Sequence, residues 1–129
     1  MADEGISKRS QELLERARRE RGYIYPEWEY VIKKDPDFFE AYNNLYEKCM
    51  KDGRALPAKT RELIAIALLA YRGLDDAVLA HAKRAIKLGA TKEEILEAVE
   101  TSMVPGGAPT FAKGLSALLK LEEDEKKTK

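Results

Sequence analysis

A run of eight apolar residues from Leu63 to Ala70 constrains the fold of this chain more than any other feature. It lies in a segment of good helix formers, with Pro57 suited to the start of a helix and Gly73 to its end. A helix that is apolar on every side offers no face to water. We therefore expect this helix to be buried within a helical bundle or shared with a second subunit.

In the remaining segments the apolar residues recur with the spacing of a helix, and none shows the sustained alternation of apolar and polar residues that marks a half-buried strand. We predict an all-α protein with about six or seven helices. The clearest boundary is Thr91-Lys92-Glu93-Glu94, which has the pattern of a capping box. Residues 104–109 contain two prolines and two glycines, which predicts a flexible break. Residues 122–129 have nothing to bury, so we expect a disordered, charged tail.

The charges of the chain are balanced, with 23 Lys and Arg against 23 Asp and Glu among 129 residues. Such a chain lacks the net field that draws basic proteins to nucleic acid or to anionic membranes. We therefore expect neither nucleic acid nor a membrane among its partners. No apolar run approaches the roughly 20 residues of a membrane span, and the polar N-terminus lacks a signal-peptide core. The expected location is cytoplasmic.

A single cysteine, Cys49, limits the thiol chemistry of the chain. One thiol forms no disulfide within the chain and supplies no two-thiol redox centre. Cys49 lies late in an amphipathic helix, a setting that favours a partly buried structural thiol over a reactive one.

Two polar residues set in apolar helices are the candidates for chemistry, Glu62 and the only histidine, His81. Val78, His81 and Ala85 share one face of a helix, so we expect the histidine to point inward. A short turn at Gly73 makes the two helices antiparallel neighbours and could bring Glu62 toward His81. A carboxylate beside an imidazole in an apolar cleft fixes the tautomer of the ring, the arrangement used for general acid/base work.

The same two residues also have structural interpretations. A buried histidine is more often a hydrogen-bonded core residue, and a buried glutamate often forms an ion pair with an arginine. One histidine without neighbouring ligands at a recognised spacing predicts no metal site, and no motif indicates a cofactor. Both the catalytic and the structural interpretation of Glu62 and His81 stay open on spacing alone.

Four segments resemble the carboxymuconolactone decarboxylase family, which includes the alkylhydroperoxidase D-like proteins. They are DPDFFEAYNNLYEKCM, LPAKTRELIAIALLAYRG, AHAKRAIKLGATKEEILEAVETS and PGGAP. The resemblance covers about residues 26–120. It implies an all-helical, alkylhydroperoxidase D-like bundle that assembles as a homo-oligomer, a trimer or a hexamer. It also implies a family domain over residues 25–121, after an N-terminal helical extension over residues 1–24.

The peroxidase branch of this family has a glutamate in one helix and CxxCxxxH in the next. Glu62 and His81 match the glutamate and the histidine, whereas the two cysteine positions are occupied by Leu74 and Ala77. A thiol peroxidase needs one thiolate to attack peroxide and a second thiol to resolve the sulfenic acid. The resemblance therefore argues against peroxidase activity at this site.

The decarboxylase branch acts without a CxxC pair, on a small-molecule carboxylate. By this resemblance, His81 would be the general acid/base, Glu62 would orient it, and Arg61 or Arg72 would hold the substrate carboxylate. Three functions stay open: a cysteine-independent lyase or isomerase, an oligomeric binding or scaffold protein without catalysis, and a peroxidase-like activity that uses Cys49.

Overall fold

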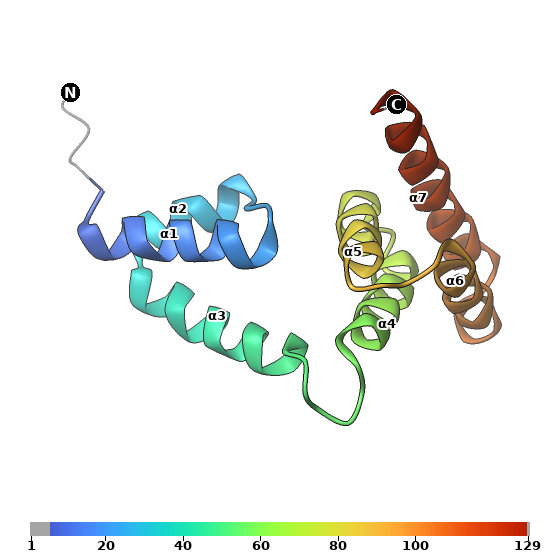
Figure 1. Cartoon of the computed structure of the whole chain (residues 1–129), viewed down its shortest axis with the longest axis horizontal. Coiled ribbons are helices and arrows are strands. Elements are labelled where there is room, and N and C mark those ends of the chain that lie inside the picture. The colour runs from blue at the N-terminus through green and yellow to red at the C-terminus, as the bar shows by residue number, and fades with distance from the viewer. Residues whose placement is uncertain (1–5, 129) are drawn as a thin grey trace. The chain divides into compact units, whose positions relative to one another are not determined.

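Seven α-helices follow one another along residues 6–128, the part of the chain that this computed structural model describes (Figure 1). The all-α prediction is confirmed. The helices fall into two compact units, Met1–Cys49 and Met50–Lys129, each with its own hydrophobic core.

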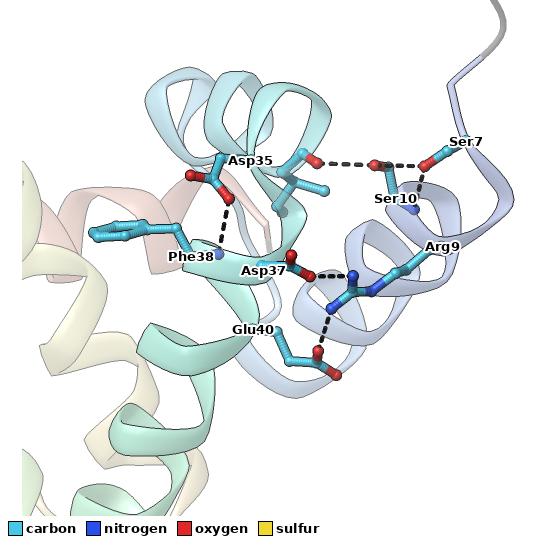
Figure 2. Close-up of polar contacts among 8 residues, drawn as sticks. Ser7, Arg9, Ser10, Asp35, Asp37, Phe38 and Glu40 are labelled. Atoms are coloured by element: carbon cyan, nitrogen blue, oxygen red, sulfur yellow. Dashed lines mark hydrogen bonds and ion pairs between the residues drawn. The ribbon is translucent and has the colours of Figure 1, made fainter.

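The N-terminal unit contains α1 (Lys8–Arg21), α2 (Pro26–Lys34) and α3 (Pro36–Met50). Short polar side chains begin two of these helices. The Ser7 hydroxyl accepts the backbone N–H of Ser10 at 3.1 Å, and the Asp35 carboxylate accepts that of Phe38 at 3.1 Å (Figure 2). Both contacts satisfy amides that have no partner within the first turn of a helix. Asp35 therefore acts as the N-cap of α3.

The core of the N-terminal unit joins all three helices. Ser10 is buried and its hydroxyl donates to the carbonyl of Ile32 at 2.8 Å, which ties α1 to α2. Arg9 binds both Asp37 and Glu40, which ties the start of α1 to α3 (Figure 2). These ion pairs are exposed and therefore stabilise little. Most of the stabilisation comes from the buried apolar side chains, which are Leu13, Leu14, Ala17, Ile32 and Phe39.

The second unit is a bundle of α4 (Ala58–Tyr71), α5 (Asp75–Lys87), α6 (Lys92–Gly106) and α7 (Ala108–Lys127) (Figure 1). The capping box at the start of α6 is confirmed, with Thr91 Oγ1 accepting the N–H of Glu94 at 3.0 Å and Glu94 accepting that of Thr91 at 2.9 Å. Small residues let the helices approach closely. A Cβ atom added at Gly114 of α7 would lie 2.3 Å from a methyl carbon of Val99 of α6. The buried core is formed by Ile66, Ala70, Val78, Ala82, Ala85, Ala90, Ile95, Val99 and Ala117.

Two expectations for the second unit are wrong in detail. The break over residues 104–109 is reduced to Gly107, because Pro105 lies in the last turn of α6, where its missing N–H removes only one helical hydrogen bond. Gly107 has φ 86°, in the region that favours glycine, and it turns the chain into α7.

The expected disordered tail is helical to Lys127. Its acidic residues pair with lysines of other helices, Asp124 with Lys83 at 2.9 Å and Glu125 with Lys92 at 2.6 Å. These exposed pairs link α7 to α5 and α6 beyond Leu121, the last apolar residue of α7, and the periodicity of the sequence gives no sign of them. Within residues 6–128, no helix is long and apolar enough to cross a membrane.

Candidate functional site

Glu62 lies in the second turn of α4 and its side chain is 2% exposed. The side chain therefore points inward, as does that of Ile66 one turn later on α4. A carboxylate removed from water is strongly destabilising unless cations or hydrogen-bond donors replace the water. Its partners therefore determine what the site can do.

His81 of α5 is the first partner of Glu62. Its Nδ1 lies 2.5 Å from Glu62 Oε2, and its side chain is 20% exposed. Gly73 makes this contact possible, because its φ of 73° reverses the chain between α4 and α5, a conformation that other residues adopt only with strain. The structure thus places the two candidate residues in direct contact, as the short turn between their helices predicted.

The contact determines how the imidazole is oriented. Which atom carries the proton between Nδ1 and Oε2 depends on the tautomer of the ring; where Glu62 is ionised, its oxygens only accept hydrogen bonds and Nδ1 is the donor. In the neutral ring, Nε2 then has a lone pair and is the nitrogen that can accept a proton from a substrate. In the protonated ring, the same nitrogen can donate one.

Arg84 is the second partner of Glu62. Its Nη1 lies 3.5 Å from Glu62 Oε1, and its side chain is 23% exposed. Arg84 is three residues after His81 on α5, so both side chains reach the carboxylate from the same face of one helix. We call these three residues, Glu62, His81 and Arg84, the Glu62 cluster. The ion pair with an arginine and the contact with His81, expected as alternatives, occur together.

Sequence reasoning expected an arginine beside Glu62 without naming Arg84, and it named Arg61 and Arg72 for a different role, that of holding a substrate carboxylate. Arg61 is 8% exposed and donates from Nη1 to the carbonyl of Lys51, so it holds the segment before α4. Arg72 caps the C-terminal end of α4 and is exposed. The signal for Arg84 was present, namely an arginine one turn after the histidine.

Leu74 and Ala77, which match the two cysteines of the peroxidase branch, lie at the start of α5. Leu74 is the N-cap residue and is 40% exposed, and Ala77 is half-buried. Cys49 belongs to the other unit and is exposed, so the expectation of a partly buried thiol is wrong. Cys49 lies in the last turn of α3, beyond the buried residues of that helix, which are Phe39 and Asn43. Among residues 6–128, no group of three or more His, Cys, Asp or Glu side chains could hold a metal ion.

A cavity of about 550 Å³ lies between α4 and α6. Neither Glu62 nor His81 lines it, because the cavity and the Glu62 cluster lie on opposite faces of α4. Ile64, Leu68 and Tyr71 line its α4 side and are 47%, 60% and 65% exposed. Large apolar side chains gathered at one surface are typical of an interface.

A second polar cluster, in the N-terminal unit, also joins an arginine to carboxylates. Arg16 of α1 donates from Nη2 to both oxygens of Glu47 of α3, at 2.8 and 2.7 Å, and from Nε to Glu20 at 3.2 Å. The buried amide of Asn43 donates to Glu47 at 3.0 Å. We call these residues, Arg16, Glu20, Asn43 and Glu47, the Arg16 cluster.

The two carboxyl groups of the Arg16 cluster titrate apart. A hydrogen bond with Glu20, and then burial, raise the pKa of Glu47 above its usual range. Burial acts to raise the pKa of Glu20 as well, but hydrogen bonds with Glu47 and Arg16 outweigh burial and lower it. The two shifts are properties of the pair and not of either residue alone. The two carboxyl groups share one proton over a wider pH range than two separate glutamates would.

Comparison with known proteins gives consistent similarities. The profile of the Carboxymuconolactone decarboxylase family matches residues 36–120. An uncharacterised protein of Methanocaldococcus jannaschii is 34% identical over 96 residues, which cover 74% of this chain and 89% of the relative. Both similarities include the whole of α4 and α5.

Two crystal structures show similar folds. A carboxymuconolactone decarboxylase family protein from Legionella pneumophila has a TM-score of 0.64 at 30% identity, over 92% of this chain and 92% of that protein. A protein from Burkholderia xenovorans has a TM-score of 0.77 at 21% identity, over 93% of this chain and 98% of the other. The second likeness concerns the fold alone.

Proposed function

The chain belongs to the carboxymuconolactone decarboxylase family, and we propose that it is a cysteine-independent lyase or isomerase that uses His81 and Glu62. The observation that carries this proposal is the 2.5 Å contact between His81 Nδ1 and a glutamate that is 2% exposed. A buried carboxylate that orients an imidazole is a recurring device of general acid/base catalysis.

In this proposal His81 transfers protons through Nε2, because Glu62 occupies Nδ1. During a decarboxylation, the bond between the carboxylate carbon and its neighbour breaks, carbon dioxide leaves, and the electron pair stays on the substrate. Protonated His81 then delivers a proton from Nε2 to that carbon, and Glu62 stabilises the imidazolium before the transfer. Each of these steps proceeds without a thiol.

The proposed substrate is a small-molecule carboxylate, as the name of the family indicates. The test is release of carbon dioxide from carboxymuconolactone by the wild-type protein and by His81→Gln. We expect the variant to lose about a hundredfold or more in kcat, which is the usual contribution of general acid/base catalysis. Lys83→Gln is the matched control, because Lys83 is exposed on the same helix and pairs with Asp124. Equal turnover by wild type and His81→Gln contradicts the proposal.

The apolar face of α4 supports a second proposal, a homo-oligomer that is a trimer or a hexamer. Ile64, Leu68 and Tyr71 are exposed there, and Val104 of α6 is 87% exposed. Burying such side chains against a second copy would remove them from water. If the Glu62 cluster has no turnover, this assembly would be the basis of a binding or scaffold function.

The oligomer is tested by measuring mass in solution for wild type and Leu68→Glu. We expect the substitution to reduce the mass to that of a smaller species. Leu45→Glu is the matched control, because Leu45 is 61% exposed in the N-terminal unit and outside this face. A monomeric wild type, or a mass unchanged by Leu68→Glu, contradicts assembly through this face.

Peroxidase-like activity is the third candidate, and the residues at the site argue against it. Leu74 and Ala77 cannot supply the attacking and resolving thiols. The one remaining thiol, Cys49, lies in the N-terminal unit.

A further inference from the structure

Arg84 is the member of the Glu62 cluster for which the proposed mechanism has no role. Its Nη1 lies 3.5 Å from the second oxygen of Glu62, Oε1, which is the oxygen that does not face His81. This contact gives Arg84 a route to the imidazole through the carboxylate.

The orientation of a glutamate carboxylate is weakly fixed by its own torsions. The last torsion of the side chain is broad, so an oxygen held at one position leaves the carboxylate free to rotate about that contact. His81 holds only Oε2. A cation at Oε1 restricts this rotation, and the attraction is strong because Glu62 is removed from water.

We propose that Arg84 is a positioning residue, which holds Glu62 so that Oε2 faces His81 Nδ1 and thereby keeps the proton of the neutral ring on Nδ1. This inference rests on the proposed role of His81, because the tautomer matters only if Nε2 exchanges protons. Without Arg84, the carboxylate turns away part of the time. The ring then also populates the tautomer with its proton on Nε2, which cannot accept a proton from a substrate.

The placement of both residues on α5 supports this role. His81 and Arg84 are three residues apart, so the same helix presents the ring and the guanidinium to the two oxygens of one carboxylate. Lys83 and Lys87 are the other basic residues of α5, and both are exposed. Lys83 pairs with Asp124 on α7, and no recorded contact links either lysine to Glu62.

The test is the tautomer of His81, measured by ¹⁵N NMR of the imidazole in the full chain between about pH 6 and pH 9. His81 is the only histidine, so its ring signals need no assignment. We expect Arg84→Gln to lower the ratio of Nδ1–H to Nε2–H tautomers about twofold or more, the lower range of couplings between contacting side chains. Arg84→Lys should restore part of the ratio, and Lys83→Gln should leave it at the wild-type value.

Arg84→Gln removes one partner of a buried charge, which can destabilise the bundle. The test is therefore repeated in Glu62→Gln, in which that charge is absent. In that background Arg84→Gln should no longer change the tautomer ratio. A further change in that background, or an unchanged ratio in folded Arg84→Gln, overturns the inference.

The measurement needs no substrate and is therefore independent of the proposed function. A tautomer shift in a protein without turnover supports the role of Arg84 and contradicts the lyase. If turnover requires His81 but the tautomer ratio of His81 is the same in wild type and in Arg84→Gln, the result supports the lyase and contradicts the role of Arg84.

Discussion

The Arg16 cluster and the Glu62 cluster both pair glutamate with arginine, but they differ in burial and in what completes them. Glu47 is 32% exposed and is bound by Arg16 across from α1 to α3 and by the amide of Asn43 within α3. Glu62 is 2% exposed, and one of its partners is an imidazole that reaches solvent. The first arrangement connects two helices, whereas the second brings a titratable ring into contact with a buried carboxylate. Buried charge is common to both, so the proposed function of the Glu62 cluster rests on the ring and its access to solvent.

The largest difference between the two clusters is expected when one glutamate in each is neutralised. We expect Glu62→Gln to lower turnover of carboxymuconolactone tenfold or more, by roughly the effect of losing the group that orients a catalytic histidine. Glu47→Gln should leave kcat unchanged, because the Arg16 cluster takes no part in the reaction. Equal losses in the two variants would mean that the clusters do not differ in function.

For stability we expect a substitution in the Arg16 cluster to have a clear effect on the N-terminal unit. Arg16→Gln removes the two hydrogen bonds to Glu47 that join α1 to α3 and should destabilise the N-terminal unit by about 1–2 kcal/mol. Hydrogen exchange of the amides of α1 and α3 measures this loss separately from the other unit. Arg9→Gln is the control and should show no measurable loss, since Arg9 is exposed where it binds Asp37 and Glu40. If the two variants exchange alike, the Arg16 cluster does not fasten the helices.

The Arg16 cluster should also show a pH dependence in which Glu47 and Glu20 act with opposite sign. Because the pKa of Glu47 is raised above its unfolded value near 4.5, its contribution to stability is present below that value and is lost as pH rises through the raised pKa. The pKa of Glu20 is lowered, so its contribution is present above the unfolded value and is lost as pH falls through the lowered pKa. The carboxyl ¹³C titration of Glu47 should move to lower pH in Glu20→Gln, because the hydrogen bond with Glu20 is the main cause of its shift. A Glu47 titration that is the same in both proteins would contradict this cause.

The smallest expected effect concerns Cys49. Replacing it with serine should leave the rate of peroxide consumption unchanged, because the site at the start of α5 has no thiols and one thiol cannot complete the cycle. A clear fall in the rate would instead assign peroxidase chemistry to the N-terminal unit.

Sequence patterns predict the local parts of this structure well. Pro26, Gly73 and Thr91 mark helix ends because each imposes its conformation or its hydrogen bond on its own neighbours. The burial of Glu62 also follows from the period of its helix. Contacts between helices are not local, and they explain what was missed. Acidic residues at the helical end of α7 pair with lysines 33 or more residues away, such as Glu125 with Lys92.

The candidate site shows the same division between local and non-local information. The helix face of His81 and the turn at Gly73 are local, and they are sufficient to expect the contact with Glu62. The arginine that pairs with Glu62 depends on which guanidinium reaches the carboxylate in three dimensions. Arg84 is one turn after His81, a spacing that is compatible with this contact but does not establish it.

The most direct test of the central claim is the ring ¹⁵N spectrum of His81 in wild type and in Glu62→Gln. We predict that the neutral ring carries its proton on Nδ1 in the wild type, and that Glu62→Gln moves a large part of the population to Nε2. A wild-type ring that is already protonated on Nε2, with a spectrum unaffected by Glu62→Gln, would contradict the claim that Glu62 prepares His81 for proton transfer.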